Sequence, residues 1–146
     1  MKSTSLFFAS LFFFCVSAFA SPSSEGSQTI EKWVHAINTG DAEGVINAFA
    51  PDAIFVGTTT KTLITRPEGI KSYFDRVFNS MSPVTVTIKE KSLTEVTDTV
   101  VVFTGLDSWK VTLNGETREA AGRLTVVMTK RNNQWQIVNF HRSAAP

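Results

Sequence analysis

Cysteine is almost absent from the chain, since Cys15 is the only one among the 146 residues. It lies within an apolar stretch, residues 6–16, that we interpret below as part of a removable leader. The folded protein is then expected to have no cysteine, which excludes disulfides, a thiol nucleophile and cysteine-ligated zinc. Histidine is also scarce. His35 and His141 are too far apart for a metal-binding spacing, so we predict no metal site.

Catalytic motifs and an excess of charge are lacking as well. There is no Gly-x-Gly-x-x-Gly fingerprint and no Gly-x-Ser-x-Gly elbow, so we predict neither a dinucleotide cofactor, nor any other cofactor, nor serine hydrolysis. The chain has 14 Lys and Arg against 13 Asp and Glu, and loss of Lys2 with the leader leaves 13 against 13. Because a neutral domain lacks the excess of positive charge that is typical of phosphate-backbone binding, we expect no nucleic-acid partner.

Residues 1–20 have the pattern of a secretory signal peptide. Lys2 supplies a positive charge, residues 6–16 are apolar and rich in Phe, and Ala18-Phe19-Ala20 is a small-x-small cleavage site. The apolar stretch is shorter than the ~20 residues of a membrane-spanning helix, which favours a cleaved signal over an anchor. We predict cleavage before Ser21, a periplasmic or secreted protein, and no membrane attachment after cleavage. The remaining residues have the length of one domain.

After the leader, the sequence predicts a short linker and then three helices. Residues 21–27 combine Ser, Pro, Gly and Glu without an apolar period, so we expect a linker there and a single domain over residues 28–146. Ser27 is the predicted N-cap of the first helix, and Asp41 that of the second. Thr65 and Glu68 form a capping box for the third. The predicted buried positions of the first and third helices are Ile30, Trp33, Val34, Ile37, Ile70, Tyr73, Phe74 and Val77.

The second half of the chain has the period of β-strands. A short strand is expected over residues 53–56, and from Val84 onward apolar residues alternate with polar ones. Asn114-Gly115 is a strong signal for a two-residue hairpin turn. Helices followed by an antiparallel meander indicate an α+β fold, in which the helices cover one face of the sheet. If the sheet is strongly curved, a conical cavity remains between sheet and helices.

The predicted hairpin register assigns residues to the two faces of the sheet. Trp109 pairs with Ala120, and Leu106 pairs with Arg123. Both faces are then largely apolar, and helices can cover only one of them, so we predict a homodimer or higher ring through the outer face. Asp107 and Arg123 point to opposite faces unless a bulge intervenes, and Gly122 is a plausible bulge position.

The C-terminal sequence resembles a known family. The run Trp135-Gln136-Ile137-Val138-Asn139-Phe140-His141-Arg142-Ser143-Ala144-Ala145-Pro146 is similar to the end of the association (hub) domain of calcium/calmodulin-dependent protein kinase II. Three further runs resemble the broader SnoaL-like, nuclear-transport-factor-2-like superfamily, which includes small secreted proteins of the SgcJ/EcaC type. These runs are Asn38-Thr39-Gly40-Asp41, Ala50-Pro51-Asp52-Ala53 and Arg66-Pro67-Glu68-Gly69-Ile70.

The resemblance implies a fold and a kind of site. The fold is a cone, built from a strongly curved antiparallel sheet and three N-terminal helices, that assembles as dimers or larger rings. In kinase hub domains the cavity is lined by arginines that bind small carboxylates, and Arg142 matches one of these arginines. The other hub arginines do not carry over, because the corresponding position is Val126 here and Arg123 lies three residues earlier.

Several residues are candidates for a ligand site, each with a structural alternative. Arg142 can hold a carboxylate in its planar fork or form a structural ion pair. Arg123, in the middle of a strand, either lines a wet pocket or crosses an interface to an acid, and we favour the pocket. Aromatic side chains are expected to wall the cavity or to belong to the core; they are Trp33, Phe55, Tyr73 and Trp109.

Two residues are candidates for catalysis. Asp107 is a possible cavity base, although an Asp near the rim of a sheet is often solvated. His141 can serve as an acid or base, or be structural, and as the neighbour of Arg142 in a strand it faces the opposite side.

These features lead to three functional hypotheses. The first is a periplasmic or secreted self-associating domain that binds a small acidic or polar-aromatic ligand in the cavity. The second is a cofactor-free isomerase, cyclase or dehydratase that uses Asp107 or His141 as base and Arg123 or Tyr73 as electrophilic support. The third is a purely structural oligomerisation module. The sequence leaves open whether the protein is an enzyme.

Overall fold

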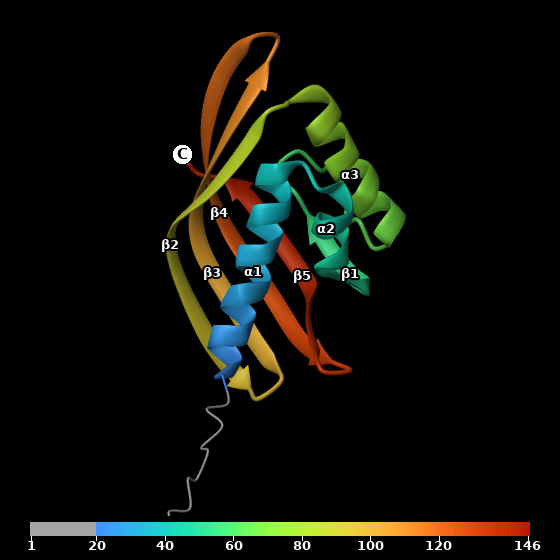
Figure 1. The fold of residues 1–146 in the computed structure, drawn as a ribbon, viewed down its shortest axis with the longest axis vertical. Coiled ribbons are helices and arrows are strands. Elements are labelled where there is room, and N and C mark those ends of the chain that lie inside the picture. The colour runs from blue at the N-terminus through green and yellow to red at the C-terminus, as the bar shows by residue number, and fades with distance from the viewer. Residues whose placement is uncertain (1–19) are drawn as a thin grey trace, which may run out of the picture.

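Three helices and a five-stranded sheet make up the part of the chain that the structure, a computed structural model, describes, residues 20–146 (Figure 1). The predicted signal peptide therefore lies, apart from Ala20, outside the described residues. The helices are α1 (Pro22–Thr39), α2 (Ala42–Asn47) and α3 (Pro67–Ser80). The strands are β1 (Phe49–Val56), β2 (Val84–Thr97), β3 (Val100–Leu113), β4 (Glu116–Arg131) and β5 (Gln134–Ala144). Within residues 20–146, no helix is long and apolar enough to cross a membrane.

The sheet has the strand order β1-β5-β4-β3-β2. Strands β2 to β5 are an antiparallel meander, and β1 adds to β5 in parallel. The helices all lie on one face of the sheet, with α1 running across β2, β3 and β5 (Figure 1). This confirms the predicted α+β architecture. We call the face under the helices the inner face and the opposite one the outer face.

The start of α1 differs from the prediction. The helix begins at Pro22 with Ser21 as its N-cap, because the Ser21 hydroxyl accepts a hydrogen bond from the Ser24 amide at 3.2 Å. The predicted linker over residues 21–27 is therefore wrong, as is the cap at Ser27. Contacts with distant strands hold these residues in place. Gly26 is buried so closely against the sheet that a Cβ atom would lie 3.2 Å from the Met128 side chain.

Glu25 fixes the same turn of α1 to the far end of the sheet. Its Oε2 accepts hydrogen bonds from Lys130 Nζ at 2.7 Å and from Trp135 Nε1 at 2.5 Å. These bonds, that from Lys130 foremost, hold the pKa of the Glu25 carboxyl below its ordinary value. The sequence of this turn has no apolar periodicity, so these tertiary contacts stabilise the turn instead.

The other predicted helix caps have mixed outcomes. Asp41 Oδ1 accepts a hydrogen bond from the Gly44 amide at 2.9 Å, so the predicted cap of the second helix is confirmed. The residue before it, Gly40, ends α1 in the left-handed conformation. The Thr65 capping box is wrong, because the N-cap of α3 is Arg66, which makes no side-chain capping bond. Since Pro67 fixes the first helical φ and has no amide hydrogen to satisfy, the helix starts there without a box.

The predicted hairpin register is confirmed. Asn114 and Gly115 both have positive φ, 52° and 81°, and Trp109 pairs with Ala120. The pairing of β3 with β4 continues through Gly122 without a shift, so no bulge occurs there. A register shift occurs instead between β4 and β5 at Val138.

Aromatic side chains fill the interior between sheet and helices. Phe55 and Phe140 stack at 4.9 Å with an interplanar angle of 11°, and Trp33 lies 5.2 Å from Phe140. Phe74 completes this cluster, and all four side chains have relative exposures of 2% or less. Trp33 and Phe55, predicted as walls of a cavity or as core, are therefore core residues.

Candidate functional site

A buried ion pair joins the middle of β3 to the end of β5. Arg142 Nε lies 2.7 Å from Asp107 Oδ2, and Arg142 Nη2 lies 2.6 Å from Asp107 Oδ1, so the contact is bidentate. Their side chains are 7% and 0% exposed, respectively. A planar guanidinium facing a carboxylate in this way gives two parallel charge-assisted hydrogen bonds. Asp107 is thus neither solvated nor free.

Arg142 makes two further hydrogen bonds. Nη1 donates to Thr58 Oγ1 at 2.6 Å, and Nη2 donates to the Ala120 carbonyl at 3.3 Å. The ring of Trp109 lies 5.2 Å from the Arg142 guanidinium, and Trp109 Nε1 donates to Asp107 Oδ2 at 3.2 Å. The Asp107 carboxylate thus accepts hydrogen bonds from three donors, two on Arg142 and one on Trp109.

Two glycines make room for the network. A Cβ atom on Gly122 would lie 2.3 Å from Arg142 Nη2 and 2.4 Å from Asp107 Oδ1. A Cβ atom on Gly57 would lie 2.6 Å from the hydroxyl oxygen of Tyr73. The next residue, Thr58, holds Arg142. The short segment 57–58 therefore separates the Tyr73 ring from the ion pair.

The outer face holds two of the predicted site residues. Arg123 pairs with Leu106 and Ser143, and His141 pairs with Thr125, and both side chains are exposed. The expectation that Arg123 lines a pocket under the helices is wrong, because its strand neighbours Gly122 and Leu124 face inward and no bulge inverts the alternation.

The structure brings together only some of the predicted residues. Asp107, Trp109 and Arg142 are in direct contact, and Tyr73, 9% exposed, packs against Gly57, the residue before Thr58. The two catalytic candidates, Asp107 and His141, lie on opposite faces of the sheet, so they cannot act on one substrate.

Sequence reasoning missed Thr58, Ala120 and Gly122. The register was a usable signal for Gly122, because it places this glycine directly opposite Asp107, where the absence of a side chain leaves space for a partner. Thr58 lies in the connection after β1, and no pattern in the sequence relates it to Arg142.

Two clefts lie along α1, and neither is lined by Asp107 or Arg142. One, of about 410 Å³, lies between α1 and β2 over Ile30, Val34 and Ile88. The other is an open groove of about 1310 Å³ next to α1, α2 and the start of β5, bordered by Glu25, His35 and Trp135. Neither cleft is lined by any of the residues predicted to bind a ligand.

The outer face has an apolar centre. Its β3 positions are Val100, Val102, Thr104 and Leu106, and Leu106 is 42% exposed. Ile54 on β1 adds a second large apolar side chain, 39% exposed. Towards the hairpin tip, Ser108 donates a short hydrogen bond to Glu119, which lowers the pKa of the Glu119 carboxyl.

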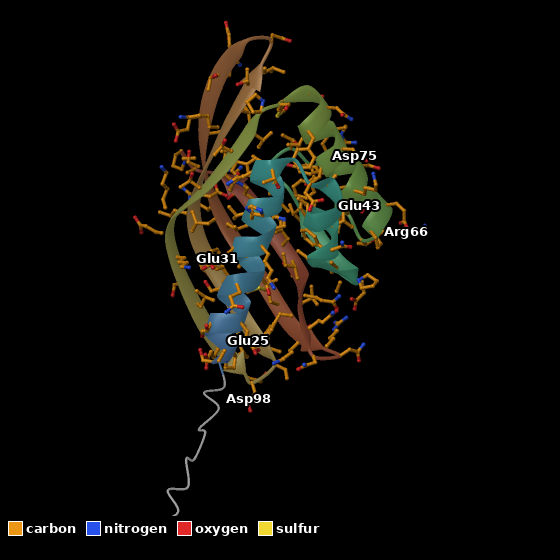
Figure 2. The ribbon with its side chains drawn as sticks, in the orientation of Figure 1. Glu25, Glu31, Glu43, Arg66, Asp75 and Asp98 are labelled. Atoms are coloured by element: carbon orange, nitrogen blue, oxygen red, sulfur yellow. The ribbon has the colours of Figure 1, made fainter. Side chains whose placement is uncertain are left out.

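The helix layer differs sharply from the outer face. Acidic side chains extend from it into solvent, with Glu31 on α1, Glu43 on α2 and Asp75 on α3 (Figure 2). Basic partners accompany some of them, because Lys91 lies 3.1 Å from Glu31 and Lys71 lies 2.8 Å from Asp75. The surface on the helix side therefore carries charges of both signs.

Comparisons with solved structures identify the fold. The chain is similar to a candidate calcium/calmodulin dependent protein kinase II association domain from Xanthomonas campestris, with 26% identity and a TM-score of 0.78 over 88% of this chain and 94% of that one. It is also similar to a nuclear-transport-factor-2-like protein of unknown function from Pseudomonas putida KT2440, with 18% identity and a TM-score of 0.74 over 84% and 86%. A ketosteroid isomerase-like protein from Erwinia carotovora shares 16% identity, with a TM-score of 0.75 over 88% and 100%.

The fold is thus the predicted nuclear-transport-factor-2-like cone. No match is found among the curated proteins. Residues 24–146 match the family described as "Calcium/calmodulin dependent protein kinase II association domain". The protein belongs to this association-domain family, as the resemblance of its C-terminal sequence predicted.

Proposed function

We propose that this protein is a self-associating domain whose contact surface is the outer face of the sheet. One observation carries the proposal: the outer face exposes Leu106 on β3 with the partly exposed Val100, Val102 and Val127 near it, and Ile54 three strands away on β1. The inner face, in contrast, is covered by the chain's own helices. Exposed apolar side chains gathered on one face are typical of protein interaction sites. Two sheets pack face to face about 10 Å apart, and a two-fold axis makes one such face complementary to itself.

Leu106→Asp tests this function. We expect the wild-type protein to be a dimer or larger at micromolar concentration by size-exclusion chromatography with light scattering. The variant is expected to be monomeric, because two symmetry-related carboxylates would then be buried near one another.

Ser72→Asp is the matched control, since it adds the same charge at an exposed position of α3. This control is expected to keep the wild-type mass. A monomeric wild-type protein, or a folded Leu106→Asp variant that still assembles, would show that the outer face is not the contact surface.

A second candidate function, binding of a small aromatic acid or phenol, is favoured by the partner of Arg142 Nη1. That partner is the hydroxyl of Thr58, an exposed residue in a connection, and a ligand oxygen can take its place next to the Trp109 ring. Asp107 already neutralises Arg142, so such a ligand would gain little from net charge and more from stacking on the aromatic rings.

Thermal unfolding with a panel of carboxylates and phenols checks this candidate. We expect a saturable rise in Tm with an aromatic member such as benzoate, and loss of that rise in Arg142→Lys, which keeps the charge but lacks the planar fork. An equal rise in both proteins, or none with any member of the panel, excludes binding at Arg142.

We also propose that the protein works in the periplasm or outside the cell. The charged, apolar and small-residue segments of residues 1–20 support export and cleavage. The N-cap of α1 follows immediately at Ser21, so cleavage there would remove no residue of the domain. Intact mass of the protein expressed with its leader checks the proposal. Export predicts a chain that begins at Ser21, and a full-length chain in the cytoplasm would oppose it.

A further inference from the structure

Glu90, Leu106 and Arg123 stand in one row across the outer face. The β2–β3 register places Glu90 opposite Leu106, and the β3–β4 register places Leu106 opposite Arg123. Neighbouring strands lie about 4.8 Å apart, so the two charged residues flank Leu106 at equal distances. Both are exposed, and neither has an ion-pair partner within residues 20–146.

The apolar residues of the outer face are concentrated on β3. Its four successive outward positions include Val100, Val102 and Leu106. The corresponding positions of the neighbouring strands are mainly polar; they are Thr94, Ser92 and Glu90 on β2, and Thr129, Val127, Thr125 and Arg123 on β4. Because interfaces have an apolar centre and a polar rim, β3 is expected to lie at the centre of a contact between two copies.

The symmetry of such a contact determines which residues meet. When two identical faces pack against each other, the two-fold axis lies in the plane of contact. Consider two residues of one copy that lie at equal distances on opposite sides of the axis. Across the contact, each of them faces the other residue of the partner copy. With the axis along β3, Glu90 of each copy faces Arg123 of the other, and the two Leu106 side chains meet between these ion pairs. An axis along β4 would instead bring the two Arg123 side chains together, and like charges so placed repel.

We propose that two copies of this chain associate about a two-fold axis that runs along β3 through Leu106, with reciprocal ion pairs between Glu90 and Arg123. The proposal rests on the proposed self-association and goes further, because it fixes the orientation of the two subunits. Arg123, for which the sequence left a pocket or an interface open, is then a residue that selects the partner.

Charge reversal tests the pairing. Arg123→Glu and Glu90→Arg are each expected to raise the dimer dissociation constant about 10-fold or more at low salt, because each creates two like-charge contacts per dimer. The double variant Glu90→Arg/Arg123→Glu exchanges the charges, and its dissociation constant is expected to return to within about 3-fold of wild type. Sedimentation equilibrium at low and high salt measures these constants. Glu43→Arg, on the helix side, is the control. It is expected to leave the dimer dissociation constant unchanged at both salt concentrations.

The outcomes separate the axis from the self-association itself. Suppose that Leu106→Asp abolishes the dimer, and that the loss of dimerisation free energy in the double variant equals the sum of the losses in the two single variants. The outer face is then still the contact surface, but the Glu90–Arg123 pairing is wrong. If Leu106→Asp is folded and still dimeric, both proposals fail. Circular dichroism of every variant shows whether the fold is kept, so that a lost dimer is not confused with a lost fold.

Discussion

Asp107→Asn is expected to lower the free energy of unfolding by about 3–5 kcal/mol, the usual cost of leaving one charge of a buried ion pair without its partner. The amide has nearly the shape of the carboxylate, so packing changes little. It cannot neutralise Arg142, however, whose side chain is only 7% exposed. Urea unfolding followed by circular dichroism, at one fixed protein concentration because association also adds stability, measures the loss.

Two comparisons show whether the loss comes from the unpaired charge. Asp98→Asn, at an exposed turn between β2 and β3, is expected to cost less than about 0.5 kcal/mol. The double variant Asp107→Leu/Arg142→Met removes both charges and is expected to be more stable than Asp107→Asn. A loss below about 1 kcal/mol for Asp107→Asn would mean that water reaches Arg142.

Gly122→Ala is expected to lower the free energy of unfolding by about 3 kcal/mol, the upper end of the range for overpacking a core. The added methyl group would overlap Arg142 Nη2 and Asp107 Oδ1, at 2.3 and 2.4 Å, and these two groups hold each other in place. One of them has to move, which breaks the bidentate contact. The same urea experiment measures the effect.

Gly69→Ala is the matched control for Gly122→Ala. Its Cβ atom would also be too close to a neighbour, at 2.6 Å, but that neighbour is the Cγ2 methyl group of the half-buried Ile64, which carries no charge and makes no hydrogen bond. Alanine also favours the helix in which Gly69 lies. We therefore expect a change within about 1 kcal/mol, and equal losses in the two variants would contradict the account of Gly122 given above.

Local signals explain why much of the fold was predictable from the sequence. The Asn114-Gly115 turn allows only one register for β3 and β4, so the faces of both strands followed from it. The first turn of α1 was not predictable in this way. Its stability comes from Gly26 against Met128 and from Glu25 with Lys130, contacts between residues about a hundred positions apart.

The candidate site was only partly predictable for a related reason. Asp107 and Gly122 were correctly placed on one face, but the orientation of Arg142 depends on β5. The register shift at Val138 reverses the alternation of that strand, so that Ile137 and Phe140 both face inward although they are three positions apart. Nothing in the sequence around Val138 marks this bulge. Predicting the contact between Arg142 and Thr58 would have required the path of the connection after β1, for which the sequence has no periodic pattern.

Leu106 and Asp107 are adjacent in β3 and project to opposite sides of the sheet. Deleting or inserting a single residue just before them would exchange their directions, sending the leucine under the helices and the carboxylate out to solvent. A change in the length of β3 is therefore expected to be tolerated best near its end at Leu113, where the hairpin extends past the helices (Figure 1).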